Sequence, residues 1–115
     1  MCVQCAEKDA DRKFSLWIRE RDGKCMAVGI IDHECKGPLA AAHGYSRRYH
    51  ATRFDPDNVW TLCSGAHLFV DTHQAEKDFL WMTLVGAPLS ASLRQSAILG
   101  MNRTDAIEKA LEELA

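Results

Sequence analysis

The sequence predicts an α+β fold, in which a small two-stranded hairpin and one helix form the core and further helices flank it. Three observations carry this prediction. Apolar or alternating segments at residues 38–43 and 59–62 indicate two short strands, with a long polar loop between them. Helical periodicity follows the second strand at once. Other helical segments precede the first strand and fill the C-terminal part, and 115 residues suit a single domain spanning 1–115 with one modest core.

The N-terminal half begins with a helix. Residues 7–22 place Phe14, Trp17 and Ile18 on one helical face, and an Asp-Gly pair at 22–23 ends the helix as a turn. Residues 25–31 are short and apolar and indicate a strand, followed by a turn-like segment and the strand at 38–43. The loop of residues 44–58 has turn chemistry in its Asp-Pro-Asp sequence at 55–57.

The C-terminal half is predicted to be helical. Ser64 is a candidate N-cap for a helix that continues to Val70, and a further helix covers residues 74–85. The Gly-Ala-Pro sequence at 86–88 interrupts the pattern. Residues 90–115 then indicate two helices divided near residues 100–102, with Thr104 or Asp105 as the cap of the last one.

Charge and composition limit the classes of function. The hydrophobic fraction of 47% and charged fraction of 26% are typical of a soluble globular protein, and a net charge of −2 does not favour nucleic-acid binding overall. A local concentration of Arg47, Arg48 and Arg53 nevertheless has no acid between His43 and Asp55. This loop is either a phosphate-facing patch or a solvated basic segment.

Two further classes are not expected. The longest apolar runs are far shorter than the roughly 20 residues that span a bilayer. The N-terminal residues have no apolar segment of the kind that secretion signals carry. We therefore expect a cytoplasmic protein with no membrane partner.

The most informative residues are His43, Asn58 and His67, with fifteen residues across the first interval and nine across the second. Histidine titrates near neutral pH and is suited to deprotonating a water molecule. His43 ends a predicted strand and faces the loop. Asn58 starts the next strand, where its side chain would either hold the His43 imidazole or bind a metal ion.

A metal ligand pair is predicted on the helix that follows. His67 and Asp71 are four residues apart, hence on one helical face. One nitrogen and one carboxylate oxygen suit Mg²⁺, Mn²⁺ or Zn²⁺. His73 is a rival ligand if the helix stops near Val70. A simple surface pair is the alternative interpretation.

The chain has five cysteines, at positions 2, 5, 25, 35 and 63. Disulfides are uncommon in the expected compartment, so metal binding and simple burial compete as explanations.

Four segments, RDGKC, GPLAAAHGYSRR, TRFDPDNVWTLC and AHLFVDTH, resemble in order and spacing the phage-type members of the HNH endonuclease family, which has a ββα-metal core. The resemblance covers about residues 22–79 and leaves a helical extension at about 88–115. It implies that His43 is the general base, Asn58 the motif asparagine and His67 the helix-borne metal ligand. Arg47 and Arg53 match positions that lie near the scissile phosphate.

The sequence departs from the family pattern at three positions. The residue before the base is Ala42, where many members have a metal ligand, and Ala66 and Val28 stand where the family has cysteines. Cys35 is a substitute for the cysteine missing at position 28. A structural zinc site of three thiolates (Cys25, Cys35 and Cys63) would then be completed by His33 or by a cysteine of the Cys2/Cys5 pair.

The resemblance implies a hydrolase that cleaves DNA phosphodiester bonds with low sequence specificity and strong salt sensitivity. Its expected cofactors are Mg²⁺, Mn²⁺, Ni²⁺ or Zn²⁺, with a structural Zn²⁺ if the cysteines bind metal. Its expected partners are DNA and, for a phage-encoded member, terminase subunits. The alternative is a zinc-stabilised DNA- or protein-binding module with a decayed nuclease site, for which Ala42 argues. A toxin-like nuclease with a neutralising partner is a third hypothesis.

Overall fold

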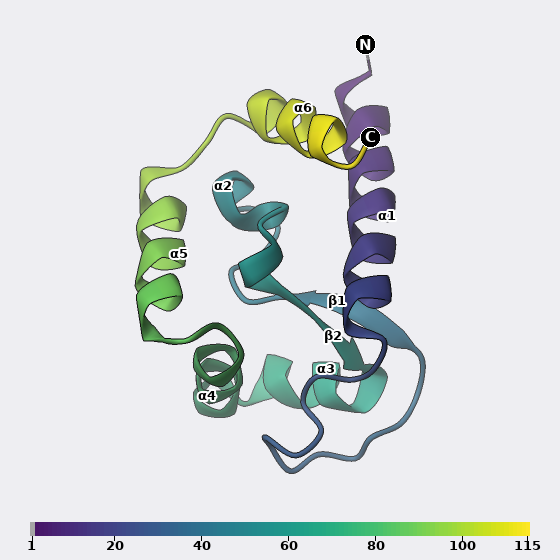
Figure 1. Cartoon of the computed structure of the whole chain (residues 1–115), viewed down its shortest axis with the longest axis vertical. Helices are drawn as coiled ribbons and strands as arrows, with labels where there is room; N and C mark the ends of the chain where they lie inside the picture. Colours follow the sequence, from purple (N-terminus) through teal and green to yellow (C-terminus); the bar gives the residue numbers. More distant parts are fainter. Residues whose placement is uncertain (1) are drawn as a thin grey trace.

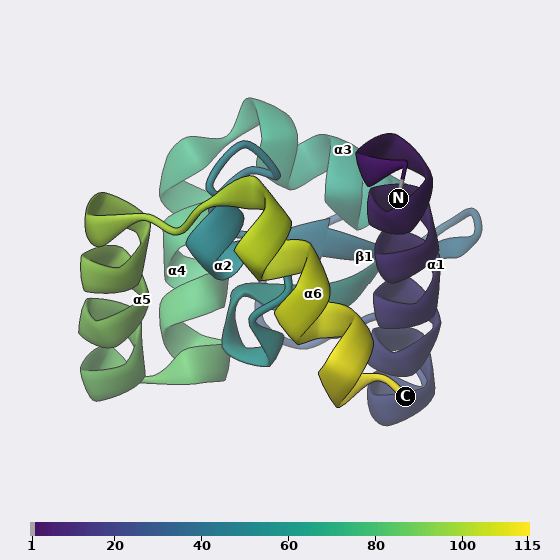
Figure 2. The ribbon, with the colours of Figure 1, turned by 90° about the horizontal axis from the view of Figure 1, so that it is seen from above.

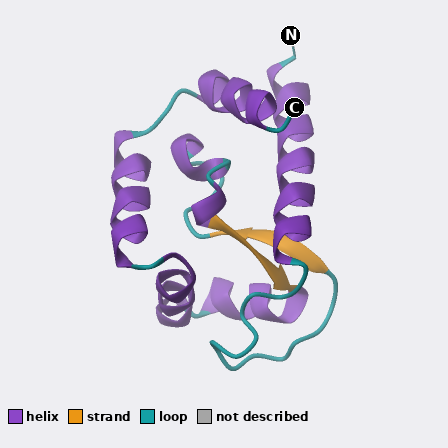
Figure 3. Ribbon diagram, in the orientation of Figure 1, coloured by secondary structure: helices purple, strands orange, loops and turns teal. Residues whose placement is uncertain are grey.

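A computed structural model describes residues 2–115, and a two-stranded antiparallel hairpin lies at the centre with helices around it (Figure 1; Figure 3). The predicted α+β class is confirmed. The elements in chain order are α1 (Val3–Asp22), β1 (Leu39–His43), α2 (His50–Arg53), the short 3₁₀ helix η1 (Pro56–Asn58), β2 (Val59–Cys63), α3 (Ser64–Thr72), α4 (Gln74–Val85), α5 (Ala87–Leu99) and α6 (Arg103–Glu113).

The register of the hairpin places His43 and Cys63 at its opposite ends. Leu39 pairs with Cys63, and His43 pairs with Val59. The end of β1 therefore lies beside the start of β2, where the 44–58 loop returns. The end of β2 lies at the other end of the hairpin, where α3 begins.

One part of the core joins α1 to the hairpin. Phe14 and Ile18 of α1 are buried and pack with Val59 of β2. Helix α6 crosses above this layer and ends beside α1 (Figure 2). Arg103 at the start of α6 donates two hydrogen bonds of 2.9 Å to the carboxylate of Glu7 in α1.

A second part of the core lies between the hairpin, α3 and α4. Leu62, Val70 and Leu80 are at most 1% exposed, and Trp81 packs with them. Burial of each of these three apolar side chains stabilises the fold by roughly 2 kcal/mol. This layer fixes α3, which carries His67, against the strands. Within residues 2–115, no helix is long and apolar enough to cross a membrane.

The strand predicted at residues 25–31 is wrong. The segment forms consecutive turns in which the N–H groups of Ile30 and Ile31 donate to the carbonyl of Ala27. Cys25 and Ala27 are buried, so the apolar run reflects core packing of a turn and not strand pairing. The 44–58 loop is also more ordered than expected, because it contains α2 and η1.

Two predicted helix caps are corrected. The Sγ atom of Cys63, not Ser64, accepts from the N–H of Ala66 at the start of α3. At α6, Asn102 accepts from the N–H groups of Thr104 and Asp105, which the sequence had indicated as caps. In both cases the cap lies one to three residues earlier than predicted, and a side-chain acceptor there satisfies free N–H groups of the first turn.

Candidate active site and metal cluster

His43 is held in one tautomer by the loop that follows it. Its Nε2 atom lies 2.9 Å from the carbonyl oxygen of Arg53. Because a carbonyl only accepts, Nε2 carries the proton and Nδ1 keeps the lone pair. Burial lowers the pKa of His43 to about 4, and the nearby charges of Arg47 and Arg53 act in the same direction. The imidazole is therefore neutral near pH 7, in the form that accepts a proton.

Arg53, which the sequence indicated as a phosphate ligand, has a different partner. Its guanidinium donates to both carboxylate oxygens of Asp11 at 3.0 and 2.6 Å, and it lies 3.5 Å from Glu7. The side chain is only 11% exposed. This correction has a physical reason, since two carboxylates of α1 neutralise the guanidinium. The ion pair instead fixes the backbone of Arg53, whose carbonyl orients His43.

Asn58 is fully buried and binds the loop, not the imidazole. Its Oδ1 accepts from the N–H of Tyr45 at 2.8 Å, and its Nδ2 donates to the carbonyls of Tyr45 and Thr52 at 3.1 and 3.0 Å. All three contacts are to backbone atoms near the two ends of the 44–53 segment. Asn58 is therefore a clamp that sets the path of the loop between His43 and Arg53.

Two residues of this clamp were missed by sequence reasoning. A Cβ atom at Gly44 would lie 2.5 Å from Nε1 of Trp81 and 2.9 Å from Oδ1 of Asn58. The indole Nε1 donates to the backbone carbonyl of Asn58 at 2.9 Å. Gly44 is thus required by close approach. The glycine that directly follows a candidate base is the signal that could have indicated it.

His67 and Asp71 form the predicted pair on α3. Nε2 of His67 lies 3.7 Å from Oδ2 of Asp71, and both side chains are accessible to solvent. Two ligands of one ion are about 3 Å apart when each bond is about 2.1 Å. At 3.7 Å, the two atoms are farther apart than two ligands of one bound ion.

His73, the predicted rival of Asp71 as a ligand, makes other contacts. Its Nδ1 lies 2.9 Å from the carbonyl oxygen of Phe69, and its ring stacks on Phe69 at 4.1 Å between centroids. Across residues 2–115, His67, Asp71 and His73 do not come together as a three-ligand group. Ala42, which precedes His43, is 2% exposed and belongs to the core cluster of Leu62 and Ala66.

The cysteine and histidine set predicted from the sequence does come together. One ligand atom from each of four side chains lies within 4.8 Å of the other three in the group of Cys25, His33, Cys35 and Cys63. In a tetrahedral zinc site, ligand atoms are separated by about 3.6–3.8 Å. Sγ of Cys25 and Nε2 of His33 are 3.8 Å apart, so this donor set fits a metal ion such as zinc.

His33 is oriented as a ligand, which answers the question of the fourth donor. Its Nδ1 lies 3.1 Å from the carbonyl of Ile31 and donates to it, so Nε2 keeps its lone pair toward the cysteines. Cys2 and Cys5 instead lie at the start of α1, where the N–H of Cys5 donates to Sγ of Cys2.

Backbone contacts hold the cluster at the start of α3. Burial opposes ionisation of Cys63, but N–H groups of Ala66 and Lys36 and the neighbouring thiols lower its pKa to about 6. The N–H of Gly65 donates to the carbonyl of Lys36 at 3.1 Å. A Cβ at Gly65 would collide with the carbonyl oxygen of Glu34. Glycine therefore allows the segment that carries Cys35 to approach α3.

The remaining predicted phosphate ligands, Arg47 and Arg48, are exposed on the loop. Arg48 donates to the hydroxyl of Tyr49 at 3.2 Å and lies over its ring. Among family models, curated proteins and solved structures, none matches this chain.

Proposed function

We propose that this protein is a metal-dependent DNA endonuclease of the HNH type, with His43 as its general base. The observation that carries the proposal is the state of His43: neutral near pH 7, with Nε2–H bonded to a backbone carbonyl and Nδ1 left as the acceptor. The free Nδ1 lone pair can take a proton from a water molecule, and the lowered pKa makes this imidazole a weaker base than a free histidine. Its position at a strand end, before Asn58 and the helix of His67, supports the proposal.

In the proposed reaction, Nδ1 of His43 takes a proton from water while the water oxygen attacks phosphorus and the 3′ oxygen departs. The imidazolium that forms is stabilised by its Nε2–H bond to the Arg53 carbonyl. That carbonyl is held by the ion pair of Arg53 with Asp11 and by the clamp of Asn58 on Thr52. These residues act by positioning the base.

His67 and Asp71 would hold the divalent ion of this reaction, since they present a nitrogen and an oxygen 3.7 Å apart. A bound ion there would supply charge neutralisation at the phosphate and at the leaving oxygen. Arg47 and Arg48 are exposed and would contact the DNA backbone. Because phosphate contacts carry no sequence information, we expect low sequence specificity and binding that weakens steeply with salt.

We further propose that the metal of the cysteine cluster is a structural Zn²⁺. The three thiolates and one imidazole are a common zinc set. The cluster joins the loop of residues 25–35, which has turns but no strand, to the start of α3. Zinc binding would therefore stabilise the segment that has the least regular structure.

A second candidate function is a DNA-binding module with a decayed nuclease site. Two observations favour it. Ala42 is buried in the core at the position where a ligand is expected, and His67 and Asp71 provide only two protein ligands. In this case the zinc cluster and the exposed arginines would persist without cleavage.

Supercoiled plasmid incubated separately with Mg²⁺, Mn²⁺, Ni²⁺ and Zn²⁺ distinguishes the two functions. We expect nicking by the native chain, at least about 100-fold slower nicking by His43→Ala, and near-native nicking by His50→Ala, a histidine of α2 in the same loop. Equal nicking by the native chain and His43→Ala would exclude the proposed base. Retardation of the plasmid without nicking would favour the binding module.

A further inference from the structure

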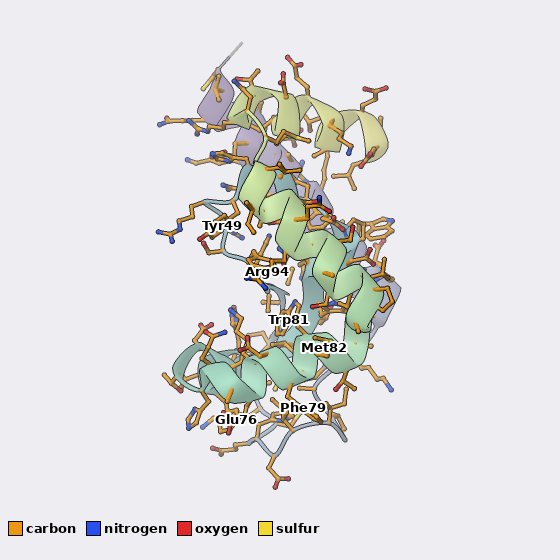
Figure 4. All side chains as sticks on the ribbon, turned by 90° about the vertical axis from the view of Figure 1, so that its left-hand side faces the viewer. Tyr49, Glu76, Phe79, Trp81, Met82 and Arg94 are labelled. Atoms are coloured by element: carbon orange, nitrogen blue, oxygen red, sulfur yellow. The ribbon has the colours of Figure 1, made fainter. Side chains whose placement is uncertain are left out.

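An open groove runs between the 45–49 loop segment, α4 and α5. It consists of two adjoining hollows of about 560 and 280 Å³ that share Tyr45, Arg94 and Ile98 as lining residues. Met82 of α4 lines the larger hollow, and Tyr49 lines the smaller one. Figure 4 shows Tyr49 and Arg94 on the same side of the molecule, above Met82 and Trp81.

The groove is cationic. In the part of the chain that the structure describes, neither hollow is lined by an acidic side chain, while Arg94 lines both. Arg48 lies over the ring of Tyr49, with its guanidinium carbon 5.1 Å from the ring centroid. The protein as a whole has a net charge of −2, so this surface differs in sign from the average of the chain.

The groove is also apolar and aromatic. Ile98 is 73% exposed, and Met82 is 47% exposed. Tyr45 and Tyr49 meet edge to face, with centroids 5.9 Å apart and planes at 74°. Exposed aromatic and aliphatic faces beside guanidinium groups are the two components of a surface that binds unpaired nucleotides: bases stack on the faces and phosphates pair with the cations.

The tyrosines are held in place before any ligand binds. Asn58 accepts from the N–H of Tyr45 and donates to its carbonyl, so the backbone of Tyr45 is fixed on both sides. Tyr49 is the N-cap residue of α2, and its carbonyl accepts from the N–H groups of Thr52 and Arg53. Ordering the backbone that carries these rings would therefore cost little on binding.

We propose that this groove binds an unpaired strand of nucleic acid, with a base stacked on the ring of Tyr49 and a phosphate on Arg94. A duplex is a poorer occupant because its bases are paired and stacked, and only their edges are accessible. Tyr45 is two residues from His43, so a strand in the groove would lead to the candidate base. In this respect the inference rests on the proposed function and names the form of DNA that the site prefers.

The test is fluorescence anisotropy with a labelled twelve-residue oligothymidylate and a labelled twelve-base-pair duplex, without added divalent ions. We expect tighter binding of the single strand. Tyr49→Ala should raise its Kd by about tenfold through the lost stacking face, whereas Tyr49→Phe should remain near the native value. Arg94→Ala should raise the Kd and reduce the slope of log K against log salt by about 0.7, the value for one phosphate contact to a single strand.

Arg19→Ala is the matched control, because Arg19 is also exposed but lies on α1, on the opposite side of the molecule from α5 (Figure 1). It should leave the Kd within about twofold of the native value. Equal effects of Arg94→Ala and Arg19→Ala would overturn the inference, as would duplex binding as tight as single-strand binding. Absence of oligonucleotide binding would also overturn it and would make a protein the better occupant.

The two proposals fail separately. Binding of the single strand that depends on Tyr49 and Arg94, in a chain that does not nick plasmid, would preserve the groove and exclude the nuclease. Nicking that depends on His43 but is unaffected by both groove variants on single-stranded and duplex substrates would preserve the nuclease and exclude the groove.

Discussion

Replacement of Asn58 by alanine tests the clamp that positions the candidate base. The side chain is 0% exposed and makes three hydrogen bonds, to the N–H and carbonyl of Tyr45 and to the carbonyl of Thr52. Each such bond contributes about 1 kcal/mol net, and the buried groups left without partners add to the loss. We expect Asn58→Ala to lower the free energy of unfolding by about 3–4 kcal/mol. At roughly 4 °C per kcal/mol, Tm would fall by about 12–16 °C.

The assay is thermal unfolding followed by circular dichroism, with Thr52→Val as the matched control. Thr52 is equally buried and lies in the same loop, but its hydroxyl makes a single bond of 3.3 Å, to the Tyr49 carbonyl, so about 1 kcal/mol is expected. Asn58→Asp keeps the acceptor of Asn58 but places oxygen against two carbonyls, and it should destabilise as much as alanine does. The reasoning is refuted if Asn58→Ala costs no more than Thr52→Val.

Three other predictions follow from the same contacts. Arg53→Ala should lower the free energy of unfolding by about 3 kcal/mol, because its ion pair with Asp11 is mostly buried. In urea unfolding, a double-mutant cycle with Asp11→Ala should give a coupling energy above 1 kcal/mol, and additive losses would contradict this. Cys25→Ser should abolish binding of one Zn²⁺ per chain in native mass spectrometry, while Cys5→Ser should retain it; metal loss in both would place the site elsewhere. The pKa of His43 is lowered to about 4 in the folded state, so the unfolded chain binds more protons between about pH 4 and 6.5. The free energy of unfolding should therefore fall as the pH drops through that range, by up to about 3 kcal/mol relative to His43→Gln. Parallel curves of stability against pH for the two chains would refute the shift.

The sequence predicted the elements whose evidence is local. The β-branched and apolar residues of β2 and the helical periodicity of α1 and α4 are contained within each segment, and all three elements form where expected. The apolar run at 25–31 fails because such a run is equally compatible with a buried turn. Cys25 and Ala27 supply the core contacts. The N–H groups of Ile30 and Ile31 bond to the nearby Ala27 carbonyl, and Met26 makes a single bond to the Thr61 carbonyl of β2.

The candidate site also contains residues that the sequence predicts and residues that it does not. The group of Cys25, His33, Cys35 and Cys63 could be predicted because the residue types themselves indicate metal binding, wherever they lie in the chain. The partner of Arg53 could not, because Asp11 is 42 residues away and nothing in the local sequence joins the two. A basic loop residue indicated a phosphate ligand until the fold placed α1 beside it.

The sequence predicts the role of Asn58 only in part. Its spacing from His43 indicates a shared site, but its side chain bonds to the backbone of Tyr45 and Thr52 and not to the imidazole. A side-chain amide can accept from an N–H group and donate to C=O groups at the same time. The 44–53 loop uses both functions, and the sequence alone does not show which backbone groups lie close enough to be bound.

The pH dependence of plasmid nicking, compared between the native chain and His43→Ala, tests the central claim most directly. The base must be unprotonated, and the pKa of His43 is about 4. The native rate should therefore rise through about pH 4 and show no further change from this group above about pH 5, while His43→Ala should be at least about 100-fold slower throughout the plateau. A native rate that His43→Ala reproduces at every pH would contradict the assignment of the base.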